Sequence, residues 1–369
     1  MEGITEAPVF VSRDPAAIMA ESKAQLERIL GRELQPAQVE QLMLQFIVYR
    51  ETLLLERFNA GMRQLLYQFS TAPVLDYVAA LMAVERLPAS HAGCTVRFSL
   101  VPGHGGVLIP DGTRVATGDG KAIFETQKDV AVPAGTDYVD IIVTAQAEGK
   151  GGNGYAAGTV VKILDPLAYV STVENIDATG GGSDVETDEQ LRERVRLAPS
   201  QFSTAGSRGS YEFHAKSANA AISDISVSSP TPGTVLIVPL TETGETPQQV
   251  INDVYNVCSA ERVRPLTDTV IVAAPVRKDY RIVVNVVLLE NSDATAAQND
   301  IMTALTGYIT EKRQKLGLDI VRSQISKIAK IESAYDVEVV EPAANMEVSA
   351  QEYTNCTNIT VNITGFSHG

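Results

Sequence analysis

The fold of this chain is constrained most by a stretch between Pro36 and Phe69 in which apolar residues recur three and four positions apart. This spacing places them on one broad face of an α-helix. Gly61 lies inside the pattern and is expected to be tolerated. At 1.5 Å per residue, the predicted helix spans roughly 50 Å. The apolar positions are Val39, Leu42, Met43, Phe46, Tyr49, Leu53, Leu54, Phe58, Met62, Leu65, Leu66 and Phe69.

Two shorter helices are expected on either side of this one. Asp14 followed by Pro15 predicts a helix N-terminus, because the aspartate caps free backbone N–H groups and proline suits the first helical position. Gly31 predicts the end of that helix. Pro73 is expected to open another helix that continues to about Arg86.

The apolar face of the long helix is too broad for two short neighbours to cover. Two arrangements would bury it: a self-contained helical hairpin, or packing against equivalent helices from other chains. We favour the second, which makes this helix a partner interface. The candidate anchors are Phe46, Leu53, Leu54, Phe58 and Leu65.

The pattern changes abruptly near residue 91. More than half of the 27 glycines lie between Gly103 and Gly182, and helical periodicity gives way to short alternating segments separated by turn signals. Alternation with a period of two indicates strands with one buried face. We therefore predict a compact antiparallel β domain, with strands near 96–100, 123–126, 130–132 and 138–145.

A run of three glycines follows this domain, and we interpret Gly180, Gly181 and Gly182 as a hinge into the next module. Beyond it, Thr187 and Gln190 have the spacing of a capping box, which predicts a helix running to Arg196. Ser210 is expected to cap another short helix that ends near Ala220.

Two small modules are predicted in the rest of the chain. The first has strands at 222–228 and 234–240, a helix at 247–263 and a strand at 269–273. The second has a strand at 280–289, helices at 294–316 and 321–331, and strands at 335–340 and 357–364. The fold class is thus multidomain α+β, with an N-terminal long-helix region, a central antiparallel β domain and two small α/β modules of split βαβ type. The expected domains are 1–90, 91–180, 181–275 and 276–369.

Composition excludes several classes of protein. The formal net charge of −15 argues against a nucleic-acid partner, because binding to a phosphate backbone needs clustered Lys and Arg. Cys94, Cys258 and Cys356 are odd in number and far apart, which predicts unpaired thiols in a reducing compartment. No signal peptide or membrane-spanning run is visible, so we expect a soluble protein made in the cytoplasm.

Two motifs suggest ligand binding, and each has a simpler interpretation. Residues 149–154 match GxGxxG, but a dinucleotide site needs a helix directly after this loop and here β-like residues follow, so we predict a tight turn. The acidic residues between Asp184 and Glu189 lack the spacing of a calcium loop and fit helix capping.

Two further groups suggest catalysis. Ser207 lies in a near match to the GxSxG nucleophile motif, and His214 and Asp224 are conceivable partners, but no strand–turn–helix elbow precedes them. His104 has no partner at metal-ligand spacing. We therefore predict no catalytic residue, no metal site and no cofactor.

Several stretches occur in an order that carries a resemblance. Ile109–Val115 (IPDGTRV) leads into Phe124–Thr126 and Val130–Gly135, and the second stretch is Ala145–Val160. The third is Gly181–Arg194 (GGSDVETDEQLRER), and Arg264–Asp268 fits the same pattern. Across residues 95–272, the order and spacing of these stretches resemble the baseplate J-like family of contractile-tail phages and tail-like bacteriocins.

The resemblance implies a structural baseplate wedge subunit. It implies that two copies join one smaller partner from the same tail operon, and that six wedges surround the central hub, with sheath and tail-fibre proteins as indirect partners. It also implies a helical bundle shared by the N-terminal regions, dimerisation through the C-terminal module, and a location in the virion or tail particle after assembly in the bacterial cytoplasm. The family offers no catalytic residue to transfer.

Two other classes of function stay open at this point. A carbohydrate-binding tail module facing the host surface would display more aromatic residues than the 6% found here, and the chain has no Trp. A cell-wall hydrolase would need paired carboxylates, a zinc site or an activated nucleophile.

Overall fold

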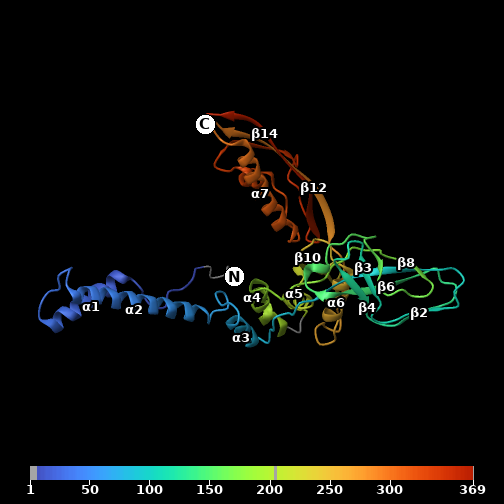
Figure 1. The fold of residues 1–369 in the computed structure, drawn as a ribbon, viewed down its shortest axis with the longest axis horizontal. Helices are drawn as coiled ribbons and strands as arrows, with labels where there is room; N and C mark the ends of the chain where they lie inside the picture. Colours follow the sequence, from blue (N-terminus) through green and yellow to red (C-terminus); the bar gives the residue numbers. More distant parts are fainter. Residues whose placement is uncertain (1–5, 203–205, 369) are drawn as a thin grey trace. The chain divides into compact units, whose positions relative to one another are not determined.

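The computed structural model describes residues 6–202 and 206–368 (Figure 1). The chain divides into two compact units. The first contains the chain up to Arg86 together with Thr187–Arg196, and the second contains Leu87–Glu186 and everything from Leu197 onward. The helix at 187–196 therefore groups with the N-terminal helices, whereas the sequence-based boundaries put it in the third domain.

The first unit consists of helices. α1 begins where the sequence predicts, because Asp14 Oδ1 accepts a hydrogen bond of 2.9 Å from the N–H of Ala16, and it ends at Gly31 with a φ of 66°. α1 and α2 lie side by side in Figure 1 around a small core of Leu34, Leu44 and Val48. The helices are α1 (Pro15–Leu30), α2 (Val39–Arg63), α3 (Val74–Ala80) and α4 (Asp188–Leu197).

Two predicted helix ends are wrong. α2 stops at Arg63 rather than Phe69, which shortens the helix to about 37 Å. The chain tightens there into turns, and Gln64 Oε1 accepts the N–H of Thr71 at 2.8 Å, which draws the following segment back. α3 stops at Ala80 rather than near Arg86, because Ala83 adopts a left-handed conformation with a φ of 56°.

The predicted β domain is confirmed as a barrel-like sheet with strand order β7-β3-β4-β6-β1-β8. β7 and β8, the two ends of this order, also contact each other, so the antiparallel sheet is nearly closed. Val96, Phe98, Phe124 and Val143 are fully buried inside it. The strands are β1 (His91–Leu100), β3 (Arg114–Thr117), β4 (Ile123–Thr126), β6 (Tyr138–Glu148), β7 (Val160–Ile163) and β8 (Val170–Asn175), while β2 (Val107–Ile109) pairs only with β5 (Val130–Val132).

A central module follows the barrel in the second unit. Its sheet has the order β11-β10-β9, with β10 antiparallel to β9 and parallel to β11. Ser207, and not the predicted Ser210, caps α5, because Ser207 Oγ accepts the N–H of Ser210 at 3.3 Å. α6 ends at Cys258, short of the predicted Val263. The elements are η2 (Ala198–Phe202), α5 (Arg208–Lys216), β9 (Ile222–Ser228), β10 (Thr234–Thr241), α6 (Gln248–Cys258) and β11 (Thr269–Val272).

The C-terminal module has a second mixed sheet, with the order β13-β12-β14 and β14 parallel to β12. Alternate residues of β12, including Ile282, Val284 and Val286, are fully buried against the two helices, as a period of two requires. The elements are β12 (Val276–Leu289), α7 (Ala294–Arg313), α8 (Arg322–Ala329), β13 (Ala334–Glu341) and β14 (Glu352–Ser367). The multidomain α+β class is confirmed. Among the described helices, none has both the length and the apolar content needed to cross a bilayer.

Candidate functional site

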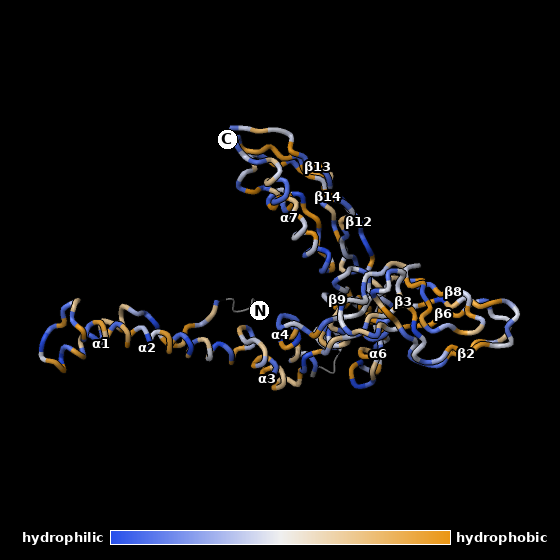
Figure 2. The backbone as a smooth tube through the Cα atoms, viewed as in Figure 1, coloured by the Kyte–Doolittle hydropathy of each residue, from blue (hydrophilic) through white to orange (hydrophobic). Residues whose placement is uncertain are grey.

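The outward face of α2 is the main candidate for a functional surface. One side of the helix turns Leu44 and Val48 into the small core. The other side leaves large apolar side chains in solvent, and along α2 the hydropathy colours of Figure 2 alternate between apolar and polar rather than marking a buried helix. Of the predicted anchors, Phe46 is 64% exposed, Leu54 66%, Phe58 49% and Leu65 64%, while Leu53 is half-buried.

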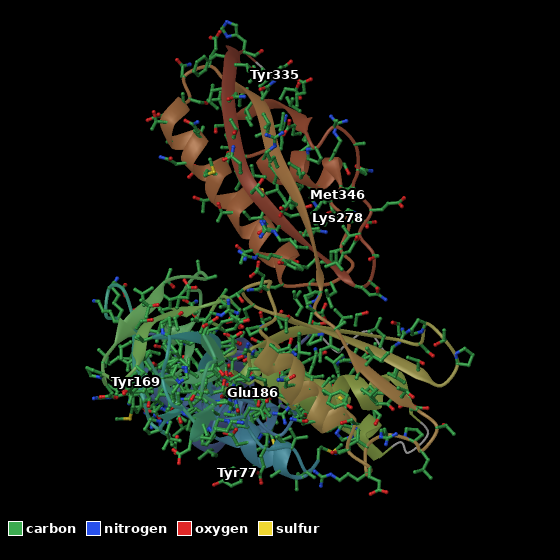
Figure 3. All side chains as sticks on the ribbon, turned by 90° about the vertical axis from the view of Figure 1, so that its right-hand side faces the viewer. Tyr77, Tyr169, Glu186, Lys278, Tyr335 and Met346 are labelled. Atoms are coloured by element: carbon green, nitrogen blue, oxygen red, sulfur yellow. The ribbon has the colours of Figure 1, made fainter. Side chains whose placement is uncertain are left out.

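Exposed apolar side chains in these helices are not confined to the predicted anchors. A single exposed apolar side chain is ordinary on a protein surface, whereas a continuous set along neighbouring helices marks an interaction surface. Tyr77 of α3 is 75% exposed (Figure 3). The further exposed apolar residues of α1 to α3 and their connections are Ile29, Leu30, Val39, Leu42, Met43, Ile47, Tyr49 and Leu81.

An extended N-terminal segment lies along α2 and is held by one buried side chain. Asn59 Oδ1 accepts the N–H groups of Phe10 and Val11 at 2.9 and 3.0 Å, and its Nδ2 donates to Val11 O at 2.8 Å. Arg63 Nε donates to Pro8 O at 3.0 Å. Sequence analysis missed this clamp, although an asparagine at an inward helical position was a signal that could have revealed it.

The remaining helix of the first unit, α4, is fixed by charged side chains. The predicted capping box is confirmed, since Gln190 Oε1 accepts the Thr187 N–H at 3.0 Å and Thr187 Oγ1 accepts the Gln190 N–H at 3.3 Å. Arg86 pairs with Asp76 at 2.7 Å and with Asp188 at 2.8 Å. Burial lowers the pKa of Arg86, but hydrogen bonds to the two carboxylates outweigh it and leave that pKa raised. Arg86 therefore stays charged and joins α3 to α4.

The three glycines interpreted as a hinge lie in a hydrogen-bonded part of the barrel. Gly180 and Gly93 exchange backbone hydrogen bonds of 3.0 and 2.8 Å, and the N–H of Gly182 donates to Asn153 Oδ1 at 3.0 Å. Gly180, Gly181 and Gly182 are all buried. The hinge stays a prediction, and motion there would have to break these bonds.

The residues considered for hydrolase chemistry have structural partners instead. Ser207 caps α5, and Asp224 Oδ2 accepts the N–H of Leu316 at 2.9 Å. His214 lies on α5, where burial, followed by repulsion from Arg262, lowers its pKa. Asp224 thus orients a loop of the C-terminal module.

The residues considered for ligand binding also have structural roles. Within residues 149–154, Lys150–Gly152 forms a short 3₁₀ helix, and the chain then leads to β7 rather than to an α-helix, so the geometry of a phosphate loop is not formed. Glu186 Oε2 accepts the N–H of Leu87 at 2.9 Å. His104 is buried and its Nε2 lies 2.8 Å from Thr136 O, so it braces a loop.

The described part of the chain contains neither a cluster of metal ligands nor a thiol with a lowered pKa. No three His, Cys, Asp or Glu side chains gather there as a metal site would require. Cys94, Cys258 and Cys356 are unpaired, and burial raises the pKa of Cys94 and of Cys258 to about 12. These thiols are therefore protonated at neutral pH and packed as small apolar groups.

The protein is modular: it has a helical region, a barrel and two small α/β modules. Its most prominent candidate site is the exposed apolar face of the helical region. Comparison with known families identifies the three folded parts. Residues 95–182 match the baseplate J-like barrel domain, 203–274 the baseplate J-like central domain and 280–362 the baseplate J-like C-terminal domain. These matches span about two thirds of the chain, and the protein belongs to the baseplate J-like family.

Two individual proteins illustrate the similarity. Over 185 residues the chain is 31% identical to baseplate protein J of Escherichia phage P2, an alignment that covers 50% of this chain and 61% of that protein. The chain thus spans about three fifths of the length of this curated relative. A solved chain of the anti-feeding prophage baseplate aligns with 93% of this chain and 89% of its own length, at 13% identity and a TM-score of 0.36.

Proposed function

We propose that this chain is a structural wedge subunit of a contractile-tail baseplate. The observation that carries the proposal is the ordered set of three baseplate J-like domains, preceded by helices whose apolar face lies in solvent. In this role the chain is located in the baseplate of a virion or tail particle. It assembles there with a second copy of itself and with one smaller partner encoded in the same tail operon.

The N-terminal helices supply the contact between chains in this proposal. Burying a large apolar side chain such as Phe46, Leu54 or Phe58 contributes about 1.5–3 kcal/mol. Association of two proteins costs about 4–15 kcal/mol in lost freedom of motion. These three of the five predicted anchors would contribute about 5–9 kcal/mol if binding buried them completely from a fully exposed state. They are 49–66% exposed, so they would contribute roughly half of that, and the further exposed residues on the same helices are needed as well.

The shape of the surface favours other helices as its occupants. α2 is a convex rod, and two such rods bury their apolar faces by fitting the side-chain ridges of one into the grooves of the other. The half-buried Leu53 and the exposed Phe46 would lie at the centre of this seam. Leu65 lies beyond the end of α2, in the turns that follow Arg63, and would contribute from there.

Native mass spectrometry of the chain co-expressed with its operon neighbour tests this proposal. The expected species contains two copies of this chain and one copy of the neighbour. A chain that stays monomeric in the presence of every tail component would contradict the wedge assignment.

We also infer that the chain assembles rather than catalyses. The support is that Ser207, Asp224 and His104 are engaged in caps, loop contacts and packing. Turnover of peptidoglycan that disappears in a His214→Ala variant would overturn this inference. Specific binding on a glycan array would instead favour a host-surface module.

A further inference from the structure

Two arginines lie in the middle of the exposed apolar face of α2. Arg50 and Arg57 are both exposed and are seven residues apart, so they lie on the same side of the helix, about 10 Å from each other along its axis. We propose that this face binds an amphipathic helix of a different chain, which places two carboxylates, also seven residues apart, opposite Arg50 and Arg57. The inference rests on the wedge function proposed above and names the chemistry of the smaller partner.

Apolar side chains surround both arginines. On the surface of a helix, the neighbours of a residue lie three, four and seven positions away. Apart from Arg57, the neighbours of Arg50 on α2 are all apolar: Met43, Phe46, Ile47, Leu53 and Leu54. All of these except the half-buried Leu53 are more than half exposed. Leu53 and Leu54 are neighbours of Arg57 as well, so a helix that covers these apolar side chains also covers the two arginines.

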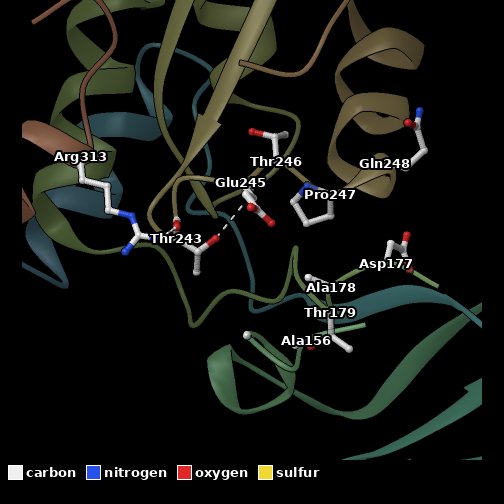
Figure 4. Close-up of a pocket in the computed structure, with 11 residues that line it drawn as sticks. Ala156, Asp177, Ala178, Thr179, Thr243, Glu245, Thr246, Pro247, Gln248 and Arg313 are labelled. Atoms are coloured by element: carbon white, nitrogen blue, oxygen red, sulfur yellow. Dashed lines mark hydrogen bonds between the residues drawn. The ribbon is translucent and has the colours of Figure 1, made fainter. Parts of the chain in front are cut away.

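Within the described residues, no hydrogen bond or ion pair engages the side chain of Arg50 or Arg57. Other arginines have acceptors within the chain. Arg114 pairs with Asp165 at 2.7 Å, and Arg313 donates to Thr243 O beside a cleft of about 530 Å³ (Figure 4). In the free chain, water therefore hydrates the guanidinium groups of Arg50 and Arg57.

Covering the apolar face removes this water. A guanidinium that leaves water without a counter-charge is strongly destabilising, and a carboxylate offsets that cost only where the two groups are hydrogen-bonded. An arginine holds a carboxylate through two parallel hydrogen bonds, which fix the position of the bound group. Carboxylates opposite Arg50 and Arg57 would therefore offset the cost of desolvation and would also set the register of the bound helix.

The α2 helix of a second copy does not offer these carboxylates. The acidic residues of α2 are Glu40, Glu51 and Glu56. Glu40 and Glu56 already form ion pairs with other arginines of the first unit. Glu51 directly follows Arg50, which turns its side chain about 100° away around the helix. Two copies of this face in contact would bring arginine against arginine, so the charges favour a different chain as the occupant.

Isothermal titration calorimetry of the full chain with the purified product of the neighbouring tail-operon gene tests the inference. That protein should contain a helix with Asp or Glu at two positions seven apart on an otherwise apolar face. Arg50→Glu combined with Arg57→Glu should weaken the complex by about 100-fold or more, because each attraction becomes a repulsion. Arg50→Lys combined with Arg57→Lys keeps the charge and loses the parallel hydrogen bonds, so the expected loss is about 10-fold.

A rescue and a control show whether the effect is specific. Changing the two carboxylates of the partner to Lys should restore tight binding to the chain that carries Arg50→Glu and Arg57→Glu. Arg262→Glu, at an exposed position of the central module, reverses one charge in the same way and should leave the affinity unchanged. Because Arg50 and Arg57 are exposed, the free variants should fold like the unaltered chain, which circular dichroism checks.

The outcomes separate this inference from the proposed function. If Leu54→Asp abolishes the complex while the arginine-reversed chain binds as tightly as the unaltered one, the apolar face is the contact but meets no carboxylates, and only the inference fails. If neither change weakens the complex, the face is not the contact and the proposed function loses its interface as well. Self-association that strengthens when arginine-reversed and unaltered chains are mixed would show that a second copy occupies the face, which also overturns the inference.

Discussion

Asn59 fixes the course of the chain before the first helix. Its side chain is fully buried on α2, and three hydrogen bonds from it hold the backbone of Phe10 and Val11. An asparagine has one acceptor and one donor group, and here both are used. The sequence pattern gave Phe10 and Val11 no role, and these hydrogen bonds attach them to the first unit.

Replacing Asn59 tests this clamp. Asn59→Ala should destabilise the first unit by about 1–3 kcal/mol, because one side of each hydrogen bond is lost. Asn59→Asp keeps the acceptor but sets a fully buried carboxylate against Val11 O, so its effect should be at least as large. Urea unfolding and proteolysis within residues 6–13 measure both, with Gln45→Ala on the exposed side of α2 as control. Equal stability of all three variants would contradict the clamp.

The pair Arg114–Asp165 makes the barrel sensitive to acid. Hydrogen bonds from the Arg114 side chain, and then from its backbone N–H, lower the pKa of Asp165 to about 2. A lowered pKa means that the pair stabilises the fold above the ordinary carboxyl pKa of about 4, and that this contribution is lost as pH falls toward 2.

The lowered pKa of Asp165 gives a prediction for how stability depends on pH. The difference in melting temperature between the unaltered chain and Asp165→Asn should be constant above about pH 4 and should shrink toward pH 2. Thermal unfolding across this range measures it, with Asp137→Asn in an exposed loop of the same domain as control. A difference that grows as pH falls would be inconsistent with the pair.

At the scale of elements, α2 is the helix on which the proposed function depends. Leu54→Asp or Phe58→Asp should abolish co-purification of the operon partner, because a carboxylate in the seam would be desolvated without a counter-charge. Both positions are exposed, so the isolated chain and its downstream modules should still fold. Gln45→Asp is the matched control, since nine residues place it half a turn of helix away from Leu54. Undiminished co-purification of the Leu54 and Phe58 variants would remove the bundle.

The elements also show what the sequence could and could not predict. Starts of helices were readable where a side chain caps the backbone, as at Asp14 and Thr187, because capping is local. Ends were misjudged at Phe69 and Arg86, where the hydrogen bond of Gln64 to Thr71 and the left-handed conformation of Ala83 decide the path. Of the barrel sheet, the alternation predicted β1, β4 and β6, whereas β3, β7 and β8 were not predicted. The near closure depends on contact between β7 and β8.

For the candidate site, the pattern of apolar residues indicated which side chains share one face of α2, and their role as anchors stays a prediction. The periodicity could not predict which face of the helix other parts of the same chain would bury. That depends on Leu44 and Val48 meeting α1 and on Asn59 binding the N-terminal segment. The close approach of Gly180 to Pro247 was invisible for the same reason, because the two residues lie far apart in the sequence.

At the scale of the whole molecule, the chain consists of two kinds of part. The barrel, central and C-terminal modules each have a buried core of their own. The N-terminal helices have a small core and a large apolar exterior. Such helices are stabilised mainly by tertiary or intermolecular packing, so this part should gain most from assembly.

Hydroxyl-radical footprinting of the free chain and of its complex with the operon partner tests this account most directly. Oxidation of Phe46, Leu54 and Phe58 should fall sharply in the complex, while Tyr255 on α6, which is 48% exposed, serves as the internal standard. If a stable complex forms and these three side chains are oxidised as fast as in the free chain, the apolar face of α2 is not the contact between subunits.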